Sequence, residues 1–107
     1  MPEFFQIDDL LRQRAAENQS YFEFLRVPSL SAGVYVLPQS GIDRQKPHRQ
    51  DEMYYVVRGR ARMQIGSEHR PVQAGSILFV RARLEHRFYD IEEELEVLVF
   101  FAPAEQE

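Results

Sequence analysis

Two histidines and one glutamate have the types and spacing that metal chemistry requires. Three residues separate His48 from Glu52, so both side chains can turn to one side where a loop ends and a strand begins. An imidazole and a carboxylate then supply two ligands for a divalent cation. His86 adds a second imidazole from a distant segment, and the resulting set suits iron(II), manganese, nickel or zinc with positions left open for water or substrate. The third histidine, His69, lies in a polar turn and is expected at the surface.

The composition of the chain excludes several classes of protein. The 107 residues include no cysteine, which excludes a disulfide scaffold, a thiol nucleophile and a thiolate metal site. The net charge of −4 is unlike the basic footprint of a nucleic-acid-binding protein. No apolar run approaches the ~20 residues that span a bilayer, and the acidic N-terminus is unlike a secretory signal. We therefore expect one cytoplasmic domain over residues 1–107 that binds a small molecule and has no nucleic-acid or membrane partner.

The pattern of apolar residues predicts one helix followed by short strands. An apolar stripe from Ile7 to Ala15 predicts a helix over residues 7–19. Residues 21–102 form β-rich runs separated by prolines, glycines and an acidic turn at residues 90–94. The predicted strands are Tyr21–Val27, Gly33–Leu37, Met53–Arg58, Arg60–Ile65, Ser76–Val80, His86–Tyr89 and Leu95–Ala102. Short strands at this spacing favour an all-β sandwich or barrel with a short N-terminal helix.

Two of the predicted strands are apolar on both faces. Residues 53–57 and 97–101 show no polar alternation, whereas a strand with one face in water alternates. The second face must therefore be covered, either by the N-terminal helix or by another copy of the chain. We expect a homodimer, and the alternative is a closed barrel that tolerates a few exposed aromatic residues.

The segments around the two site histidines resemble the two short motifs of the cupin superfamily of small β-barrels. In the first segment, Glu52 and Gly59 stand at the spacing of the motif, and His48 takes the place of its second histidine. The place of the first histidine falls on Lys46. Because the spacing from the preceding glycine is one residue longer than in the motif, Gln45 and Pro47 are alternative occupants.

In the second segment, Gly75 and His86 keep the places that the second motif gives them. Three other places of this motif, those of a proline, a glycine and an asparagine, are taken by Arg81, Arg83 and Asp90. The resemblance extends over residues 33–102, and it implies a cupin-type double-stranded β-helix, or jelly-roll, barrel.

The resemblance also implies a set of metal ligands. Members of the superfamily usually bind metal through two histidines and the glutamate of the first motif, together with the histidine of the second. This chain keeps three of these four ligands, which are His48, Glu52 and His86. We expect Gln45, Asp51 or water to supply a fourth oxygen. Lys46 would repel a cation if it pointed inward, so it is expected to point to solvent.

Alternation along the strands predicts which other side chains face the interior of the barrel. The inward positions that follow Glu52 are Tyr54 and Val56, and the one that follows His86 is Phe88. We assign Tyr54 as a proton donor beside a bound substrate, and Glu52 as a ligand that can also serve as a base.

The residues predicted to bind substrate are Gln45, Arg81, Arg83 and Phe88. The two arginines share a face of an extended segment, so they can hold a carboxylate or a phosphate of the substrate. The alternative is that they lie on the outer rim of the barrel and pair with acidic residues such as Asp51 or Glu85.

Three functions are compatible with these residues. The first is a metal-dependent enzyme that acts on a small molecule, such as a dioxygenase or another oxygenase, an isomerase, a lyase or a cyclase. The second is a non-catalytic ligand-binding or sensory module with weak or no metal binding. The third is an inert structural barrel. Three polar groups that face an apolar interior argue against the third function, since they would be costly without a partner.

Overall fold

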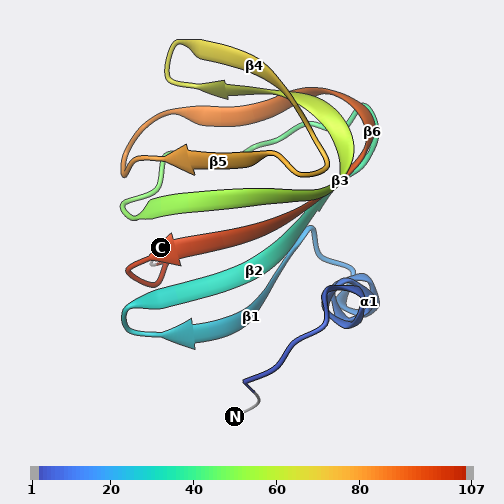
Figure 1. Ribbon diagram of the computed structural model, residues 1–107, viewed down its shortest axis with the longest axis vertical. Helices are drawn as coiled ribbons and strands as arrows, with labels where there is room; N and C mark the ends of the chain where they lie inside the picture. The colour runs from blue at the N-terminus through green and yellow to red at the C-terminus, as the bar shows by residue number, and fades with distance from the viewer. Residues whose placement is uncertain (1–2, 106–107) are drawn as a thin grey trace.

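One helix and six strands make up residues 3–105, the part of the chain that the structure, a computed structural model, describes (Figure 1). The elements are α1 (Ile7–Glu17), β1 (Tyr21–Val27), β2 (Leu30–Leu37), β3 (Asp51–Ile65), β4 (Glu68–Gln73), β5 (Ile77–Val80) and β6 (His86–Ala102). This arrangement confirms the predicted all-β fold with a short N-terminal helix. Within residues 3–105, no helix is long and apolar enough to cross a membrane.

The strands pair in antiparallel fashion in the order β1–β2–β6–β3–β4, and β5 pairs with β3. The first half of β3 pairs with β5 and with the end of β6. The second half of β3 pairs with β4 and with the start of β6. Figure 1 shows β1, β2, β6, β3 and β5 side by side, with β4 and the second half of β3 curling over above them. The barrel therefore has two layers, one that contains β1, β2 and β5 and one that contains β4. The two longest strands, β3 and β6, take part in both layers.

The two long strands correct two predicted boundaries. Gly59 was expected in a turn between two strands, but it lies inside β3, with φ at +99° where the pairing with β6 is irregular. A Cβ atom at Gly59 would collide with the Glu94 carbonyl, so only glycine fits there. The acidic residues 90–94 were likewise expected in a turn, but they lie within β6. These irregularities shift the inward face of β3 from even to odd positions, as its burial pattern shows.

Smaller differences affect the other elements. The helix ends at Glu17 rather than at residue 19, because Asn18 adopts the left-handed conformation and its N–H bonds to the Ala15 carbonyl. β2 begins at Leu30, three residues earlier than expected. β4 was missed, and His69 lies on this strand instead of in a turn, although it is exposed as predicted.

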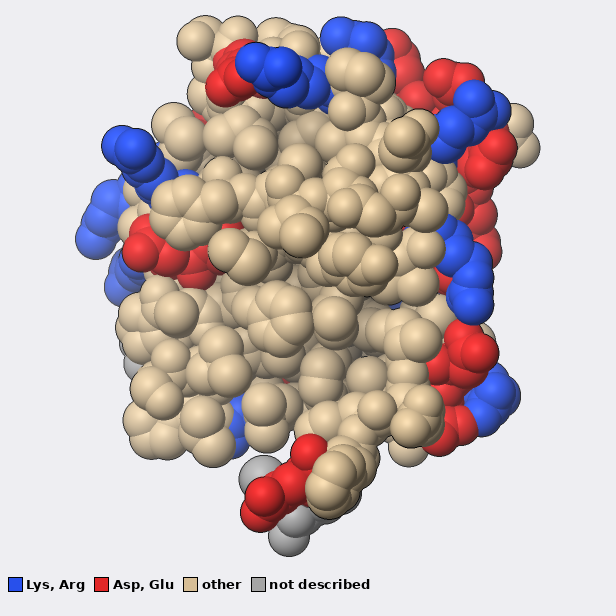
Figure 2. All heavy atoms as spheres, viewed as in Figure 1, with Lys and Arg blue, Asp and Glu red and all other residues tan. Residues whose placement is uncertain are grey.

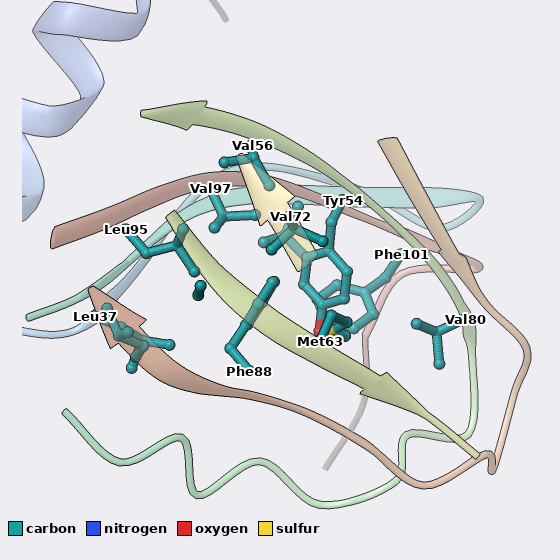
Figure 3. Close-up of a cluster of buried hydrophobic side chains, with 13 residues drawn as sticks. Leu37, Tyr54, Val56, Met63, Val72, Val80, Phe88, Leu95, Val97 and Phe101 are labelled. Carbon is teal, nitrogen blue, oxygen red and sulfur yellow. The ribbon is translucent and has the colours of Figure 1, made fainter. Parts of the chain in front are cut away.

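The core of the barrel lies between the two layers, and Figure 3 shows aliphatic and aromatic side chains from both of them meeting there. Its members are buried residues of β3, β4, β5 and β6 together with the end of β2. They are Leu37, Tyr54, Val56, Ala61, Met63, Val72, Val80, Phe88, Ile91, Leu95, Val97, Val99 and Phe101. Removal of this much apolar surface from water is the main force that holds the layers together.

The outer face of the layer that contains β1, β2 and β5 is only partly covered. The helix α1 packs on β1 and β2, where it buries Leu10. Over β3 and β5, four apolar side chains remain 41–66% exposed, namely Met53, Tyr55, Ile77 and Phe79. Met53 pairs with Phe79 and Tyr55 with Ile77, so the four are neighbours on one surface. Figure 2 shows that the middle of this side of the molecule is free of charged groups, which lie around its edge. The expected homodimer remains a prediction.

Candidate metal centre

Asp43 anchors the irregular segment that carries His48, which comprises residues 38–50. The buried Asp43 carboxylate accepts hydrogen bonds from the Tyr35 hydroxyl at 2.9 Å and from the Phe88 main-chain N–H at 2.9 Å. It also accepts one from the Gln45 side-chain amide at 2.9 Å. These bonds attach the segment to β2 and β6 and so fix where His48 lies. Asp43 was not identified from the sequence, because nothing distinguishes it from the other polar residues of this segment.

Glu52 is the second residue of β3, and His86 is the first residue of β6. Both side chains point into the barrel and are almost fully buried. Glu52 lies at the start of the inward-facing row that continues with Tyr54 and Val56, as the alternation predicted. The His86 Nε2 atom is 3.0 Å from Glu52 Oε1, and the His48 Nε2 atom is 4.0 Å from the same oxygen. Ligand atoms of the three residues lie within 4.8 Å of one another.

The ligand atoms that converge here have no hydrogen-bond partner outside their own cluster. Within residues 3–105, His48 Nε2, His86 Nε2 and both Glu52 carboxylate oxygens are buried and make no hydrogen bond to a group outside the cluster, and the 3.0 Å contact of His86 Nε2 with Glu52 Oε1 is the closest approach among them. Unpaired buried polar atoms are rare in folded proteins and cost free energy. Two imidazole nitrogens and a carboxylate are ligands that divalent transition metals accept. The residues present therefore fit a metal ion.

The environment of His86 shows how the fold orients a ligand. Its Nδ1 atom is 2.9 Å from the Leu84 carbonyl, which fixes the proton on Nδ1 and directs Nε2 toward Glu52. Burial by itself lowers the pKa of His86. The Glu52 carboxylate and the Leu84 carbonyl outweigh this effect, so the pKa of His86 lies above its ordinary value of 6.5.

Tyr54 lies next to the candidate ligands, with its ring centroid 6.2 Å from that of His86. Its hydroxyl donates a hydrogen bond to Gln45 Oε1 at 2.9 Å, and its ring packs against Phe88 with a centroid separation of 5.3 Å. Burial raises the pKa of Tyr54 well above its ordinary value of 10.0, and the charge of Glu52 adds to this effect. Tyr54 is therefore neutral, with its proton held toward Gln45. Figure 3 shows its ring within the packed core rather than in an open space.

The remaining residues that the sequence singled out lie in different places. Gln45 lines the cavity described below, whereas Phe88 is part of the core. Arg81 and Arg83 are exposed and are not among the residues that line this cavity. The main-chain N–H of Arg83 nevertheless donates to the His48 carbonyl, which ties the segment before β6 to the histidine.

Two other expectations about this region concern Asp51 and Lys46. Asp51 is exposed and accepts a hydrogen bond from the Ala82 N–H at 2.9 Å, so it faces away from the three ligands. Lys46 is exposed, as expected.

A cavity of about 500 Å³ adjoins His48. Its wall is mainly apolar and aromatic, with a few polar groups, which is the usual character of a small-molecule site. The lining residues are Ser20, Tyr21, Tyr35, Val36, Leu37, Pro38, Gly41, Ile42, Arg44, Gln45, His48, Val99, Phe101 and Glu105. Tyr21 and Glu105 were not predicted for the site. The ring of Tyr21 occupies the space above Gly33, where a Cβ atom would collide with it.

Comparison with known proteins identifies relatives of the chain. Residues 33–101 match the family model described as cupin domain. An uncharacterized protein of Streptomyces coelicolor is 46% identical over 101 residues, which cover 94% of this chain and 96% of that protein.

Solved structures share the fold at lower identity. A Bacillus halodurans protein has a TM-score of 0.79 at 16% identity and covers 100% of this chain and 85% of its own. A Thermus thermophilus protein has a TM-score of 0.74 at 20% identity over 96% of this chain and 99% of its own. An RmlC-like cupin from Shewanella frigidimarina has a TM-score of 0.72 at 19% identity over 78% of this chain and 75% of its own.

Proposed function

The chain belongs to the cupin domain family, and from this premise we propose that it is a metal-dependent enzyme acting on a small molecule. In this proposal His48, Glu52 and His86 hold one divalent iron, manganese, nickel or zinc ion. The cavity beside His48 receives the substrate. The proposed reaction is of the oxygenase, isomerase, lyase or cyclase type, with a dioxygenase, an isomerase or a lyase as the leading choices.

One observation carries the proposal. The Nε2 atoms of His48 and His86 and the Glu52 oxygens meet inside an apolar barrel, and among the described residues none of these atoms makes a hydrogen bond to a group outside the cluster. A neutral barrel without a cation leaves most of these buried atoms unsatisfied, and each unpaired buried group costs about 1–3 kcal/mol. A bound divalent cation would satisfy all of these atoms at once.

The residues around the candidate ligands have distinct roles in this proposal. A bound metal would supply Lewis acidity, or oxygen activation if it is iron. The aromatic and aliphatic wall of the cavity, which includes Tyr35 and Phe101, excludes water and binds the apolar part of a substrate. Tyr54 keeps a proton beside Glu52, in a hydrogen bond to Gln45. Arg44 and Gln45 lie on the same wall and provide polar contacts.

A second candidate function is a non-catalytic binding or sensory module. The observation that favours it is the position of Tyr54, since its hydroxyl is fully buried and already donates to Gln45. A proton donor in this state needs a rearrangement before it can reach a substrate. A module that only binds a ligand beside the metal does not need this step.

Elemental analysis of protein purified without a histidine tag tests the proposal. We expect about one equivalent of a transition metal in the wild-type protein and none in the His86→Ala variant. The matched control is His69→Ala, because His69 is exposed on β4 and lies outside the cluster. Absence of metal from the wild type, even after reconstitution under reducing conditions, would overturn the metalloenzyme proposal.

The identity of the metal then selects the assays that separate the two candidate functions. Iron directs the assay to oxygen uptake with small aromatic and aliphatic substrates, and zinc or nickel directs it to isomerase and lyase tests. Metal-loaded protein that binds such compounds in a thermal-shift screen but converts none of them supports the binding module.

A further inference from the structure

His48 is the one candidate ligand that no strand carries. It lies at the end of the irregular segment 38–50, so the main chain alone does not fix its ring. Two residues from the C-terminal end of the described chain contact the ring. Phe101 packs edge-on against it with a centroid separation of 4.9 Å, and Glu105 Oε2 lies 3.2 Å from its Nδ1 atom.

Glu105 is itself held firmly in place. Its main-chain N–H donates to the hydroxyl of the buried Ser31 at 2.8 Å, and its carbonyl accepts a hydrogen bond from Arg26 at 2.7 Å. The preceding residue, Ala104, is buried and donates its N–H to the Pro28 carbonyl at 3.3 Å. These contacts attach the C-terminal segment to β1, to β2 and to the turn between them. The carboxylate of Glu105 is thereby presented to His48 at the wall of the cavity.

The contact determines which nitrogen of His48 carries the proton. An ionised carboxylate only accepts hydrogen bonds, so the Nδ1 atom that faces Glu105 must be the protonated one. The lone pair of the ring is then on Nε2, which is the atom directed toward Glu52. His86 has the same arrangement, with the Leu84 carbonyl in the part that Glu105 plays for His48.

We propose that Glu105 is a positioning residue that fixes the tautomer and orientation of His48 and thereby increases the affinity of the site for metal. The part of this inference that concerns metal affinity rests on the proposed function. Carboxylates that accept the second N–H of a ligating histidine raise the basicity of the ligand, and their loss typically costs about 10–100-fold in metal affinity. Glu105 does not serve as a further ligand here, since it contacts the ring on the side opposite to Glu52.

The test compares Glu105→Ala and Glu105→Gln with the control Glu94→Ala, which removes an exposed carboxylate on β6. The contacts that hold residue 105 in place use its main-chain atoms, so both variants should keep them. The first measurement is the pair of imidazole ¹⁵N chemical shifts of His48 in the metal-free protein. We expect the Nδ1–H tautomer in the wild type, in Glu105→Gln and in the control, and a shift toward the Nε2–H tautomer in Glu105→Ala.

The second measurement is zinc affinity by competition with a chelator. We expect Glu105→Ala to bind zinc about 10–100-fold more weakly than the wild type. Glu105→Gln should recover part of this loss, because its amide oxygen still accepts the hydrogen bond. Unchanged tautomer and zinc affinity within twofold in Glu105→Ala would overturn the inference while leaving the proposed function intact. A wild type that binds no zinc, together with a tautomer change in the variant, would overturn the proposed function and support the positioning of His48.

Discussion

Replacement of Asp43 by alanine is expected to destabilise the barrel and detach the segment that carries His48. The carboxylate accepts four hydrogen bonds, from the Tyr35 hydroxyl, the Phe88 N–H and the main-chain and side-chain N–H groups of Gln45. Asp43 is only 8% exposed, so water does not replace it easily when it is removed.

The four donors do not contribute equally to the expected loss. The Phe88 N–H lies in the buried interior, and leaving it without an acceptor costs about 1–3 kcal/mol. Tyr35 and Gln45 are half-buried, so their donors can turn to water and should add about 1 kcal/mol together. The expected total is about 3 kcal/mol. Asp43→Asn keeps one acceptor oxygen and is expected to lose about 1 kcal/mol.

Urea unfolding of the metal-free protein, followed by circular dichroism, measures these values. With a slope of about 1.5 kcal/mol per molar urea, a loss of 3 kcal/mol lowers the midpoint by about 2 M. The matched control is Asp51→Ala, because Asp51 is exposed and accepts a single hydrogen bond. If Asp43→Ala were no less stable than Asp51→Ala, the idea that Asp43 anchors the segment would be refuted.

Three further predictions address other parts of the molecule. Gly59→Ala is expected to destabilise the protein by more than about 1 kcal/mol, since the added Cβ collides with the Glu94 carbonyl at a positive φ; a melting temperature lower by less than about 4 °C would contradict this. The raised pKa of His86 stabilises the metal-free fold below pH 6.5, and this contribution is lost as the pH rises through the folded value. Urea midpoints measured in the metal-free state should therefore fall above pH 6.5, and His86→Ala should lack that component. The wild type is expected to be a homodimer that pairs through the exposed surface around Ile77 and Phe79, so light scattering should show a dimer that Ile77→Asp converts to monomer; a monomeric wild type would exclude it.

The cluster of His48, Glu52 and His86 could be predicted because its signals are local. The spacing of His48 and Glu52 and the alternation after Glu52 depend only on where a strand begins. The motif resemblance then placed His86 beside them, and the structure brings the three together.

The lengths of β3 and β6 could not be predicted from the same local signals. Glycine with a positive φ and a run of acidic residues occur in turns, but they also occur where a long strand bends from one layer to another. Gly59 and Glu94 lie opposite each other at such a bend. The sequence does not show which of the two outcomes applies, because the choice depends on pairing partners that lie far away in the chain.

The contributions of Tyr21 and Glu105 could not be predicted for a different reason. Tyr21 reaches the cavity because β1 pairs with β2 at a register that places its ring over Gly33. Glu105 reaches His48 because the chain continues past β6 and bonds to Ser31. Both contacts join residues that are distant in sequence, and no periodicity within either segment signals them.

The length of β3 and β6 also limits how the barrel can open. These strands pair from Asp51 opposite Ala102 to Ile65 opposite His86, and each runs through both layers. The layers therefore cannot separate as two halves of a hinge, since two continuous strands would have to break. Access to the cavity is instead expected past the segment 38–50 and residues 103–105, which contribute Arg44, His48 and Glu105 to its wall. Entry to the cavity would then depend on the side chains that these two segments place in its wall, and not on separation of the two layers.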